Sequence, residues 1–323
     1  MPELPEVTTT VNGLKKVLPG LVISDVWTDL TKKKTIKQFN KTLKNENFYK
    51  KFKKEVVGAK IIKVERRAKN ILIHLNNNET ILIHLKMTGH LLFGEYTQKI
   101  ITKDKARITN WRPKYHGPLN DPYNRFIHVV FSFKNPSTKL RTSNQKQLTF
   151  CDSRKFGKVT LLSASPEIRE LGPEPLDKEF TFEKFKNRIV GKTGKIKTIL
   201  MNQSVVAGIG NIYSDEMLWL AKIHPKSEPA KIPDLKLKDL YRAMKKVLNG
   251  GIKFGGDSMS DYRNIYGEKG KFQNKHNVYQ KKNEKCGKKG CKGVIMREVI
   301  NSRSAYFCNK HQKLYGRKRT YRK

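Results

Sequence analysis

Hydrophobic residues recur at helical spacing near the start of the chain. Val7, Val11, Leu14 and Leu18 are three or four positions apart, so they fall on one face of an α-helix. Two prolines and two glutamates stand among residues 2–6, and both types are common in the first turn of a helix. The pattern predicts an amphipathic helix that begins within the first few residues.

From about residue 55 to 162 the pattern is typical of β-strands. The apolar pentads 71–75 and 81–85 flank an Asn-rich turn and predict a β-hairpin. Two further segments continue the β pattern, 126–133 and 148–150. The segment 97–125 is polar and contains prolines, and it predicts a long irregular surface loop.

The second half of the chain is predicted to be helical. Residues 163–177 contain three prolines without a clear period, which indicates a hinge between domains. Gly255 and Gly256 are predicted to end a later helix, and residues 257–277 to form a mobile loop. That helix has an apolar stripe made of Leu237, Leu240, Met244, Val247 and Leu248.

The charge of the chain favours a polyanionic partner. Its 323 residues include 68 Lys and Arg against 28 Asp and Glu, a formal net charge of +40. Each basic side chain that meets a phosphate releases counterions, so nucleic acid is the expected ligand. Composition alone leaves DNA and RNA open. No apolar run reaches the roughly 18 residues of a membrane span, and no secretory signal is expected, so we expect a cytoplasmic, nucleoid-associated protein.

Three of the four cysteines lie near the end of the chain and predict a metal site. Four cysteines are too few for a disulfide framework, and Cys151 is expected to be an inert buried thiol. The ligand spacing Cys-x4-Cys-x16-Cys-x2-His predicts one structural tetrahedral Zn²⁺ per chain. His276 or an external ligand remains an alternative to the histidine of this motif. The predicted ligands are Cys286, Cys291, Cys308 and His311.

The residues between the two ligand pairs predict a β-hairpin with an arginine near its tip. Residues 301–304 read Asn-Ser-Arg-Ser. A hairpin stiffened by a metal would hold Arg303 where its guanidinium can bind a phosphate with two hydrogen bonds.

The N-terminus carries a candidate nucleophile. If Met1 is removed, the chain begins with the secondary amine of Pro2, followed by Glu3. An α-amino group titrates near pH 8, roughly, and its neutral form can attack carbon to form an iminium. Glu3 could transfer a proton, and Glu6 lies one turn later on the same helix face. The alternative is that both acids only complement the helix dipole.

Residues 201–213 indicate two helices joined by a tight turn. The first helix is predicted to end near Ala207, and the second to begin at about Asn211, after a turn with two glycines. Free backbone N–H groups at the start of the second helix can bind a phosphate. The alternative is a plain helix hairpin without a ligand.

Two loops that follow strands carry residues suited to a distorted duplex. Residues 86–89 contain Met87, and residues 152–157 contain Arg154 and Phe156. Such side chains at loop tips could act as wedges between bases. The alternative is that Met87 and Phe156 pack in the core, as apolar residues usually do.

Together these segments resemble the formamidopyrimidine-DNA glycosylase family over essentially the whole chain. Residues 1–7 resemble its N-terminal signature, with Leu4 typical of the branch that acts on purine lesions. Residues 66–69 resemble its phosphate-contacting lysine loop. Further matches, in the same order along the chain, are 171–176, 203–213 and 255–262.

The resemblance implies an α+β multidomain fold with five parts. A catalytic two-sheet β-sandwich with flanking helices would span 1–162, and a hinge 163–177. A helical helix–two-turn–helix domain, including a loop that caps the lesion, would span 178–282. A β-hairpin zinc finger would span 283–315, before a basic tail at 316–323.

The resemblance also implies roles for single residues. Pro2 would attack the sugar C1′, Glu3 would serve as acid and base, and Glu6 would position the sugar or the lesion. Lys69 and Arg303 would complete the catalytic set by holding phosphates. Other DNA contacts would come from Asn211, Gly210 and Tyr213, and the gap left by a flipped base would be filled by Met87, Arg154 and Phe156.

The activity implied is that of a bifunctional DNA glycosylase and abasic-site lyase of base excision repair. It would remove oxidised purines, 8-oxoguanine and formamidopyrimidines, from damaged double-stranded DNA through a Pro2 Schiff base and β,δ-elimination, as a monomer. The alternatives are an endonuclease VIII-like enzyme for oxidised pyrimidines and a non-catalytic nucleic-acid-binding paralogue. Against the family pattern, the first two cysteines are four residues apart rather than two, His311 replaces a cysteine, and 97–125 is an insertion.

Overall fold

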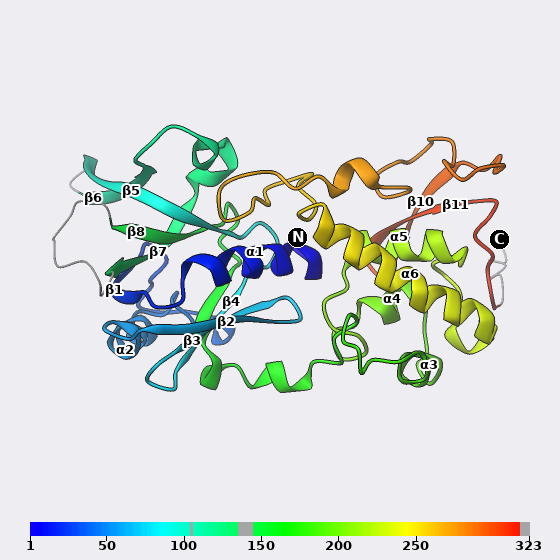
Figure 1. Ribbon diagram of the computed structural model, residues 1–323, viewed down its shortest axis with the longest axis horizontal. Coiled ribbons are helices and arrows are strands. Elements are labelled where there is room, and N and C mark those ends of the chain that lie inside the picture. The colour runs from blue at the N-terminus through cyan, green and yellow to red at the C-terminus, as the bar shows by residue number, and fades with distance from the viewer. Residues whose placement is uncertain (104–105, 135–144, 317–323) are drawn as a thin grey trace. The chain divides into compact units, whose positions relative to one another are not determined.

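The computed structural model describes residues 1–103, 106–134 and 145–316, and contacts divide the chain into two compact units. The first unit comprises Met1–Ile168 together with Phe254–Gln273, and the second comprises Arg169–Lys253 together with the segment from Asn274 onward. Figure 1 colours the chain by residue number, so the return of Phe254–Gln273 to the first unit can be followed there. The predicted basic tail lies outside the described residues, apart from Gly316.

The first unit is built around two antiparallel sheets. A five-stranded sheet has the order β1-β7-β8-β5-β6, and a four-stranded sheet has the order β2-β3-β4-β9. The strands of the larger sheet are β1 (Val22–Thr28), β5 (His90–Lys103), β6 (Ala106–Pro113), β7 (Ile127–Lys134) and β8 (Lys146–Cys151). Those of the smaller sheet are β2 (Ile61–Arg67), β3 (Asn70–Leu75), β4 (Thr80–His84) and β9 (Lys158–Leu161).

Two helices complete the core of this unit, α1 (Leu4–Val17) and α2 (Glu46–Val56). The residues of the predicted N-terminal stripe are buried in one cluster with residues of both sheets, which confirms that helix. Ile265, from the distant segment Phe254–Gln273, is only 1% exposed and joins the same cluster. That segment therefore packs with the first unit, whereas the sequence analysis grouped it with the helical domain.

The predicted hairpin of apolar pentads is present, with Ile71 paired to Ile83. The prediction of an irregular loop over 97–125 is wrong for its first half. β5 and β6 form a long ladder from the pair Tyr96–Pro113 onward. An antiparallel strand at a sheet edge can face water, so polar composition there did not exclude strands. The remainder of the insertion holds two short 3₁₀ helices, η2 (Pro118–Asn120) and η3 (Pro122–Arg125).

The described part of the second unit combines four α-helices with one β-hairpin. They are α3 (Phe182–Val190), α4 (Ile196–Met201), α5 (Asn211–Ala221), α6 (Asp234–Lys253), β10 (Ile295–Ile300) and β11 (Arg303–Cys308). The apolar stripe of α6 is confirmed, with Val247 half-buried and its other members buried. Other 3₁₀ turns are η1 (Lys37–Phe39), η4 (Leu162–Ala164), η5 (Pro166–Glu170), η6 (Pro229–Lys231) and η7 (Phe272–Lys275). Within the described ranges, no helix combines the length and apolar character that crossing a bilayer requires.

Candidate active site

The first turn of α1 is buried and holds two carboxylates. Pro2 is buried, and Glu3 and Glu6 are each 1% exposed. The backbone N–H of Glu3 donates to Oε2 of Glu6 at 2.7 Å. This bond satisfies one of the N–H groups that a helix start leaves without an intrahelical partner. The Glu6 carboxylate thus fixes the backbone directly after Pro2.

The second oxygen of the Glu6 carboxylate binds the segment that returns from the far end of the chain. Oε1 accepts a hydrogen bond from the backbone N–H of Asp257 at 2.8 Å. The Tyr262 hydroxyl donates to the carbonyl oxygen of Glu6 at 3.0 Å, and burial raises the pKa of that hydroxyl. Glu6 therefore joins α1 to Phe254–Gln273 through its carboxylate and its backbone carbonyl, and a direct contact with the sugar or the lesion stays a prediction.

Met87, Arg154 and Phe156 stand on two neighbouring loops of the first unit. Met87 is 38% exposed and Phe156 is 50% exposed, so the alternative that they pack in the core is wrong. A guanidinium nitrogen of Arg154 lies 3.5 Å from the Met87 sulfur. The structure therefore brings these predicted wedge residues to the surface, with Arg154 and Met87 in contact.

Asp152 organises both loops, a role that the sequence analysis missed. Its Oδ1 accepts from the Thr88 hydroxyl and, at 3.3 Å, from the backbone N–H of Arg154. Its Oδ2 accepts from the backbone N–H of Gly157 at 2.6 Å. An Asp at the start of a turn is a recognisable signal. The partner Thr88 is 64 positions away, so the link between the loops had no signal in the sequence.

Lys69 occupies a two-residue turn between β2 and β3. Arg67 pairs with Asn70 across this turn, and Ala68 has a φ of 53°, a left-handed conformation uncommon outside glycine. A guanidinium nitrogen of Arg66 donates to the Ala68 carbonyl at 2.9 Å. Lys69 itself is only 6% exposed. The Lys69 side chain is thus largely shielded from solvent.

In the second unit, the turn before α5 is built by the side chain of Gln203. Its Nε2 donates to the carbonyls of Met201 and Ile209, each at 2.8 Å, and its Oε1 accepts from the Gly208 N–H at 2.8 Å. The start of α5 at Asn211 confirms the second predicted helix. The predicted end of the first helix near Ala207 is wrong, because side-chain bonds to the backbone end α4 at Met201.

The predicted contacts of α5 differ in exposure. Gly210 caps the helix and Asn211 is half-buried at its first position. The Oδ1 atom of Asn211 is buried and has no hydrogen-bond partner among the described residues. Tyr213 is fully buried. Its predicted contact with DNA stays a prediction.

A buried ion pair attaches the hairpin β10–β11 to the helices. Lys197 and Asp215 lie 2.6 Å apart, with side chains 1% and 0% exposed. The Lys197 ammonium also donates to the Ser304 carbonyl at 2.7 Å, and the Tyr306 N–H donates to Asp215 at 3.0 Å. Burial raises the pKa of Asp215 to about 7, and the attraction of Lys197 acts in the opposite direction. This pair, which the sequence analysis missed, fixes the strand on which Arg303 stands.

Arg303 lies where the sequence predicted it, at the tip of the hairpin. It pairs with Ile300 across a turn of Asn301 and Ser302, which both have positive φ, as two-residue hairpin turns require. Its side chain is exposed.

The four predicted metal ligands converge. One ligand atom from each of them lies within 4.8 Å of all the others. The Nδ1 atom of His311 is 3.4 Å from the Cys286 sulfur and 3.6 Å from the Cys291 sulfur, and the Cys291 and Cys308 sulfurs are 3.6 Å apart. A tetrahedral Zn²⁺ would separate such ligand atoms by roughly 3.5–3.8 Å, so the cluster fits a metal ion. His276, the alternative ligand, is not part of it.

The second nitrogen of His311 and two of the sulfurs have further contacts. His311 Nε2 lies 3.2 Å from the Trp219 carbonyl, and the Trp219 indole donates to the Cys286 sulfur at 3.4 Å. The Gly293 N–H donates to the Cys291 sulfur at 3.3 Å. Contacts of this kind orient ligands and stabilise thiolates. Consistent with them, the Gly293 N–H lowers the pKa of Cys291.

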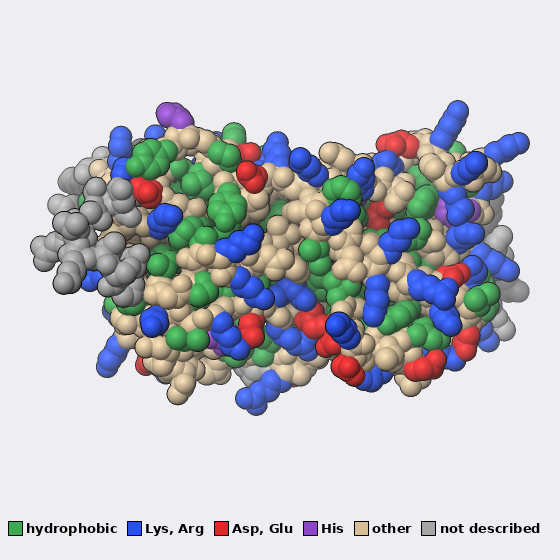
Figure 2. Space-filling view, in the orientation of Figure 1, with side chains coloured by type: hydrophobic (Ala, Val, Ile, Leu, Met, Phe, Trp, Pro, Cys, Tyr) green, Lys and Arg blue, Asp and Glu red, His purple; other side chains and the backbone are tan. Residues whose placement is uncertain are grey.

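Basic side chains outnumber acidic ones on the face drawn in Figure 2. Figure 2 shows Lys and Arg spread over both units on the face in view, with acidic groups much scarcer. This distribution agrees with the formal net charge of +40.

The comparisons with known proteins cover nearly the whole chain. The model of the formamidopyrimidine-DNA glycosylase N-terminal domain matches residues 1–159, and that of the formamidopyrimidine-DNA glycosylase H2TH domain matches residues 171–263. A formamidopyrimidine-DNA glycosylase of Desulforamulus reducens is 34% identical over 319 residues, which cover 97% of this chain and 99% of the relative.

Solved structures show the same likeness. A mutant of Lactococcus lactis Fpg in complex with Fapy-dG containing DNA aligns with a TM-score of 0.75 at 29% identity, covering 97% of this chain and 100% of that one. MutM in complex with carbocyclic 8-oxo-G containing DNA aligns with a TM-score of 0.74 at 29% identity and the same coverage. With family models that match on both sides of the hinge and a relative that is 34% identical over nearly the whole length, the chain belongs to the formamidopyrimidine-DNA glycosylase family.

Proposed function

We propose that this DNA glycosylase is bifunctional, removes oxidised purines from duplex DNA and then cleaves the strand. The observation that carries the proposal is the buried first turn of α1, where Pro2 precedes Glu3 and the Glu6 carboxylate fixes the backbone of Glu3 at 2.7 Å. Once Met1 is removed, the chain begins with a secondary amine next to a carboxyl group that is 1% exposed.

The reaction follows from that pair of groups. The lone pair of the Pro2 nitrogen forms a bond to C1′ while the glycosidic bond breaks and the base leaves with its electron pair. The Pro2 N–H proton passes to the departing base. Glu3 then supplies a proton to the sugar ring oxygen as the C1′–O4′ bond breaks, and the opened sugar remains as an iminium on Pro2. The iminium acidifies the C2′ proton. Two successive eliminations then release the phosphates on both sides, leaving a one-nucleotide gap.

The remaining predicted residues would hold the DNA. Met87, Arg154 and Phe156, two of them large exposed apolar groups, would fill the space left by an extruded base and offset part of its unstacking cost. Phosphate contacts would come from Lys69, Asn211 and Arg303. Relatives solved with Fapy-dG and 8-oxo-G containing DNA support purine lesions over the endonuclease VIII-like alternative.

The Cys₃His cluster would hold one structural Zn²⁺. Its ligands would be Cys286, Cys291, Cys308 and His311, which lie close enough to share one ion. Bound there, the ion would supply cross-linking of the hairpin that presents Arg303 and no catalytic chemistry. We further propose that the segment from about Met259 to Phe272, which belongs to the first unit, caps the extruded base. The functional domains would otherwise follow the predicted boundaries, and the protein would act as a monomer on the bacterial nucleoid.

Borohydride trapping tests the proposal. A duplex with one 8-oxoguanine opposite cytosine is incubated with wild type, Pro2→Gly and Glu3→Gln, each with its N-terminus sequenced. A covalent adduct on residue 2 of wild type, absent from Pro2→Gly, would support the amine mechanism and Met1 removal together. Binding of the duplex without adduct or cleavage would refute it. A thymine glycol duplex then separates a pyrimidine enzyme from a protein that only binds.

A further inference from the structure

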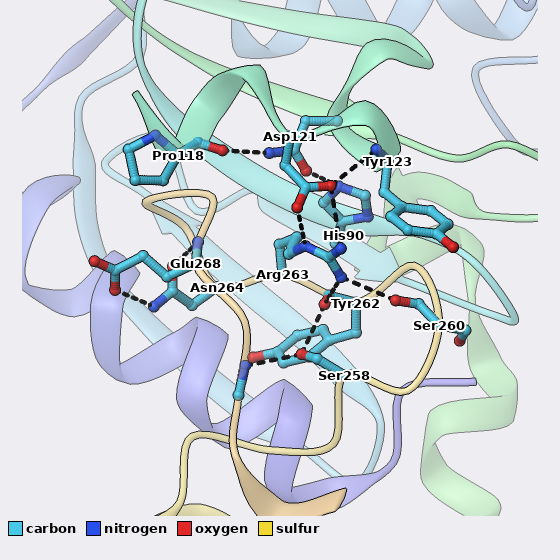
Figure 3. A network of polar contacts seen from close by, with 12 residues as sticks. His90, Pro118, Asp121, Tyr123, Ser258, Ser260, Tyr262, Arg263, Asn264 and Glu268 are labelled. Atoms are coloured by element: carbon cyan, nitrogen blue, oxygen red, sulfur yellow. Dashed lines mark hydrogen bonds and ion pairs between the residues drawn. The ribbon is translucent and has the colours of Figure 1, made fainter. Parts of the chain in front are cut away.

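Arg263 carries a charge that is buried inside the first unit. Its side chain is 1% exposed, and its Nε and Nη2 donate to the two carboxylate oxygens of Asp121 at 3.0 and 3.1 Å. Nη1 donates to the carbonyls of Ser260 and Tyr262 at 2.9 and 2.8 Å. Figure 3 shows the guanidinium enclosed by these acceptors. All three nitrogens are thus engaged, in the bidentate geometry that makes an arginine–carboxylate pair directional.

Asp121 belongs to the insertion between β6 and β7, and this part of the insertion is itself anchored. Asp121 accepts from the Tyr123 N–H at 3.0 Å. Asn124 donates to the Pro118 carbonyl at 3.0 Å, and its side-chain oxygen lies 2.9 Å from Nε2 of His90. His90 is 1% exposed, at the first position of β5. The carboxylate that binds Arg263 is therefore held on the sheet.

The segment Phe254–Gln273 also touches the insertion through its backbone. Gly267 has a φ of 87°, and a Cβ there would lie 2.5 Å from the Pro118 carbonyl oxygen. The Ile265 carbonyl accepts from the Phe93 N–H at 2.7 Å. No larger side chain fits at position 267 without moving one of the two segments.

Two adjacent residues of this segment bind two different parts of the first unit. Tyr262 binds α1, through the carbonyl of Glu6, in the same turn as the proposed nucleophile. Arg263 binds the insertion through Asp121. The Tyr123 ring covers the guanidinium at 4.8 Å. The segment is thereby fixed between the first turn of α1 and the insertion.

We infer that Asp121 and Arg263 are positioning residues that fix Phe254–Gln273 for recognition of a base-carrying lesion. This inference rests on the proposed function, in which that segment caps an extruded base. A segment that is already ordered loses less conformational entropy on binding. An abasic site has no base to cap, so its cleavage needs Pro2 but not the ion pair. The insertion thus serves base selection rather than strand cleavage.

The test compares two reactions in the full-length protein. The variants are Arg263→Met, Asp121→Asn and their combination, with Arg125→Met as the matched control. Arg125 is an exposed arginine of the same insertion, so its loss changes the charge equally. Release of free 8-oxoguanine is measured in single turnover on a duplex with the lesion opposite cytosine, and strand cleavage on a duplex with a preformed abasic site. Thermal unfolding of each variant verifies that it folds.

Base release should slow by about tenfold or more in both single variants, because a misplaced capping group loses orientation. Abasic-site cleavage should equal that of wild type, and Arg125→Met should match wild type in both reactions. The double variant should be no slower than either single variant, since all three lose the same interaction. Three outcomes would each overturn the inference. They are a double variant whose loss in base-release rate equals the product of the two single losses, an equal fall in the rates of base release and abasic-site cleavage, and an unchanged rate of base release in the single variants.

Trypsin gives a readout that needs no activity. Lys269 and Lys271 are exposed within the segment, and Arg263→Met should accelerate cleavage after them while Arg125→Met should not. Unchanged cleavage would also overturn the inference. If wild type releases no base from any duplex, the proposed function is refuted, and the inferred role of Asp121 and Arg263 in base selection is refuted as well. Faster trypsin cleavage would still establish in that case that Arg263 fixes the segment.

Discussion

Gly256 lies against the Glu6 carboxylate, which holds the first turn of α1. Its φ is 84°, and a Cβ there would be 2.9 Å from Cγ of Glu6 and 3.0 Å from the Tyr262 ring. Gly255 has a similar φ of 74°, but its Cβ would meet only the Cα of Gly270, at 3.7 Å. The two glycines thus share a backbone conformation and differ in their neighbours.

Gly256→Ala should therefore impair base excision far more than Gly255→Ala. Both substitutions cost about 1 kcal/mol of folding stability through the left-handed backbone. Only Gly256→Ala also displaces the Glu6 carboxylate and with it the backbone after Pro2, for which we expect a loss of roughly 30-fold or more in single-turnover excision. Equal rates for the two variants would mean that the contact with Glu6 does not matter for catalysis.

Residues with local signals were the ones that the sequence could predict. The spacing of the metal ligands predicted a cluster that the structure brings together, whereas the catalytic role of Pro2 and Glu3, inferred from position alone, stays a prediction. The carboxylates of Asp152 and Asp121 could not be assigned roles in this way. Their partners Thr88 and Arg263 are 64 and 142 positions away, and a hydrogen bond between distant segments leaves no periodicity in the sequence.

At the scale of elements, the hairpin β10–β11 has the four predicted metal ligands gathered at its base. The cluster Trp219, Val278, Cys286, Ile295 and Cys308 is small, and a two-stranded hairpin alone is only marginally stable. Beside the Lys197–Asp215 ion pair, which also holds the hairpin, we expect a metal cross-link at its base to contribute to its order.

Metal removal should consequently disorder the hairpin. We expect one zinc ion per chain by elemental analysis, and loss of metal together with weaker DNA binding after treatment with a strong chelator. His311→Ala should lower the metal content in the same way. Cys151→Ala is the control, because Cys151 is a buried thiol outside the cluster. A chelated protein that binds DNA as wild type does would contradict this dependence.

Elements with a clear period were predicted correctly and those with mixed polarity were not. The stripe of α6 and the twin pentads have one buried face, which reads directly from the sequence. The ladder β5–β6 and the early end of α4 could not be read from the sequence in this way. Polar strands at a sheet edge resemble loops, and the α4 end depends on bonds from the Gln203 side chain to Met201 and Ile209.

At the scale of the whole molecule, the large excess of basic side chains should make DNA binding depend on the salt concentration. With a formal net charge of +40, binding to duplex DNA should weaken steeply as salt rises, because each phosphate contact releases counterions. Arg303→Ala should reduce the slope of log K against log salt by about 0.9, the value for one phosphate contact. Arg297 is also exposed, on the neighbouring strand, but donates to the Ser304 hydroxyl at 2.7 Å. Arg297→Ala should leave the slope unchanged, and equal slopes for both variants would refute a phosphate contact by Arg303.

The placement of Ile265 has a consequence for how the protein is made. This side chain fills the core of the first unit beside Gly13, where a Cβ would lie 2.8 Å from it. During synthesis, residues up to Ile168 leave the ribosome first, and Arg169–Lys253 of the second unit follow before Ile265 emerges. Until then the apolar residues that pack around Ile265, next to α1, remain uncovered in the nascent first unit. The first unit therefore completes its core late in translation, and a chain truncated at the hinge would expose that apolar surface to chaperones and proteases.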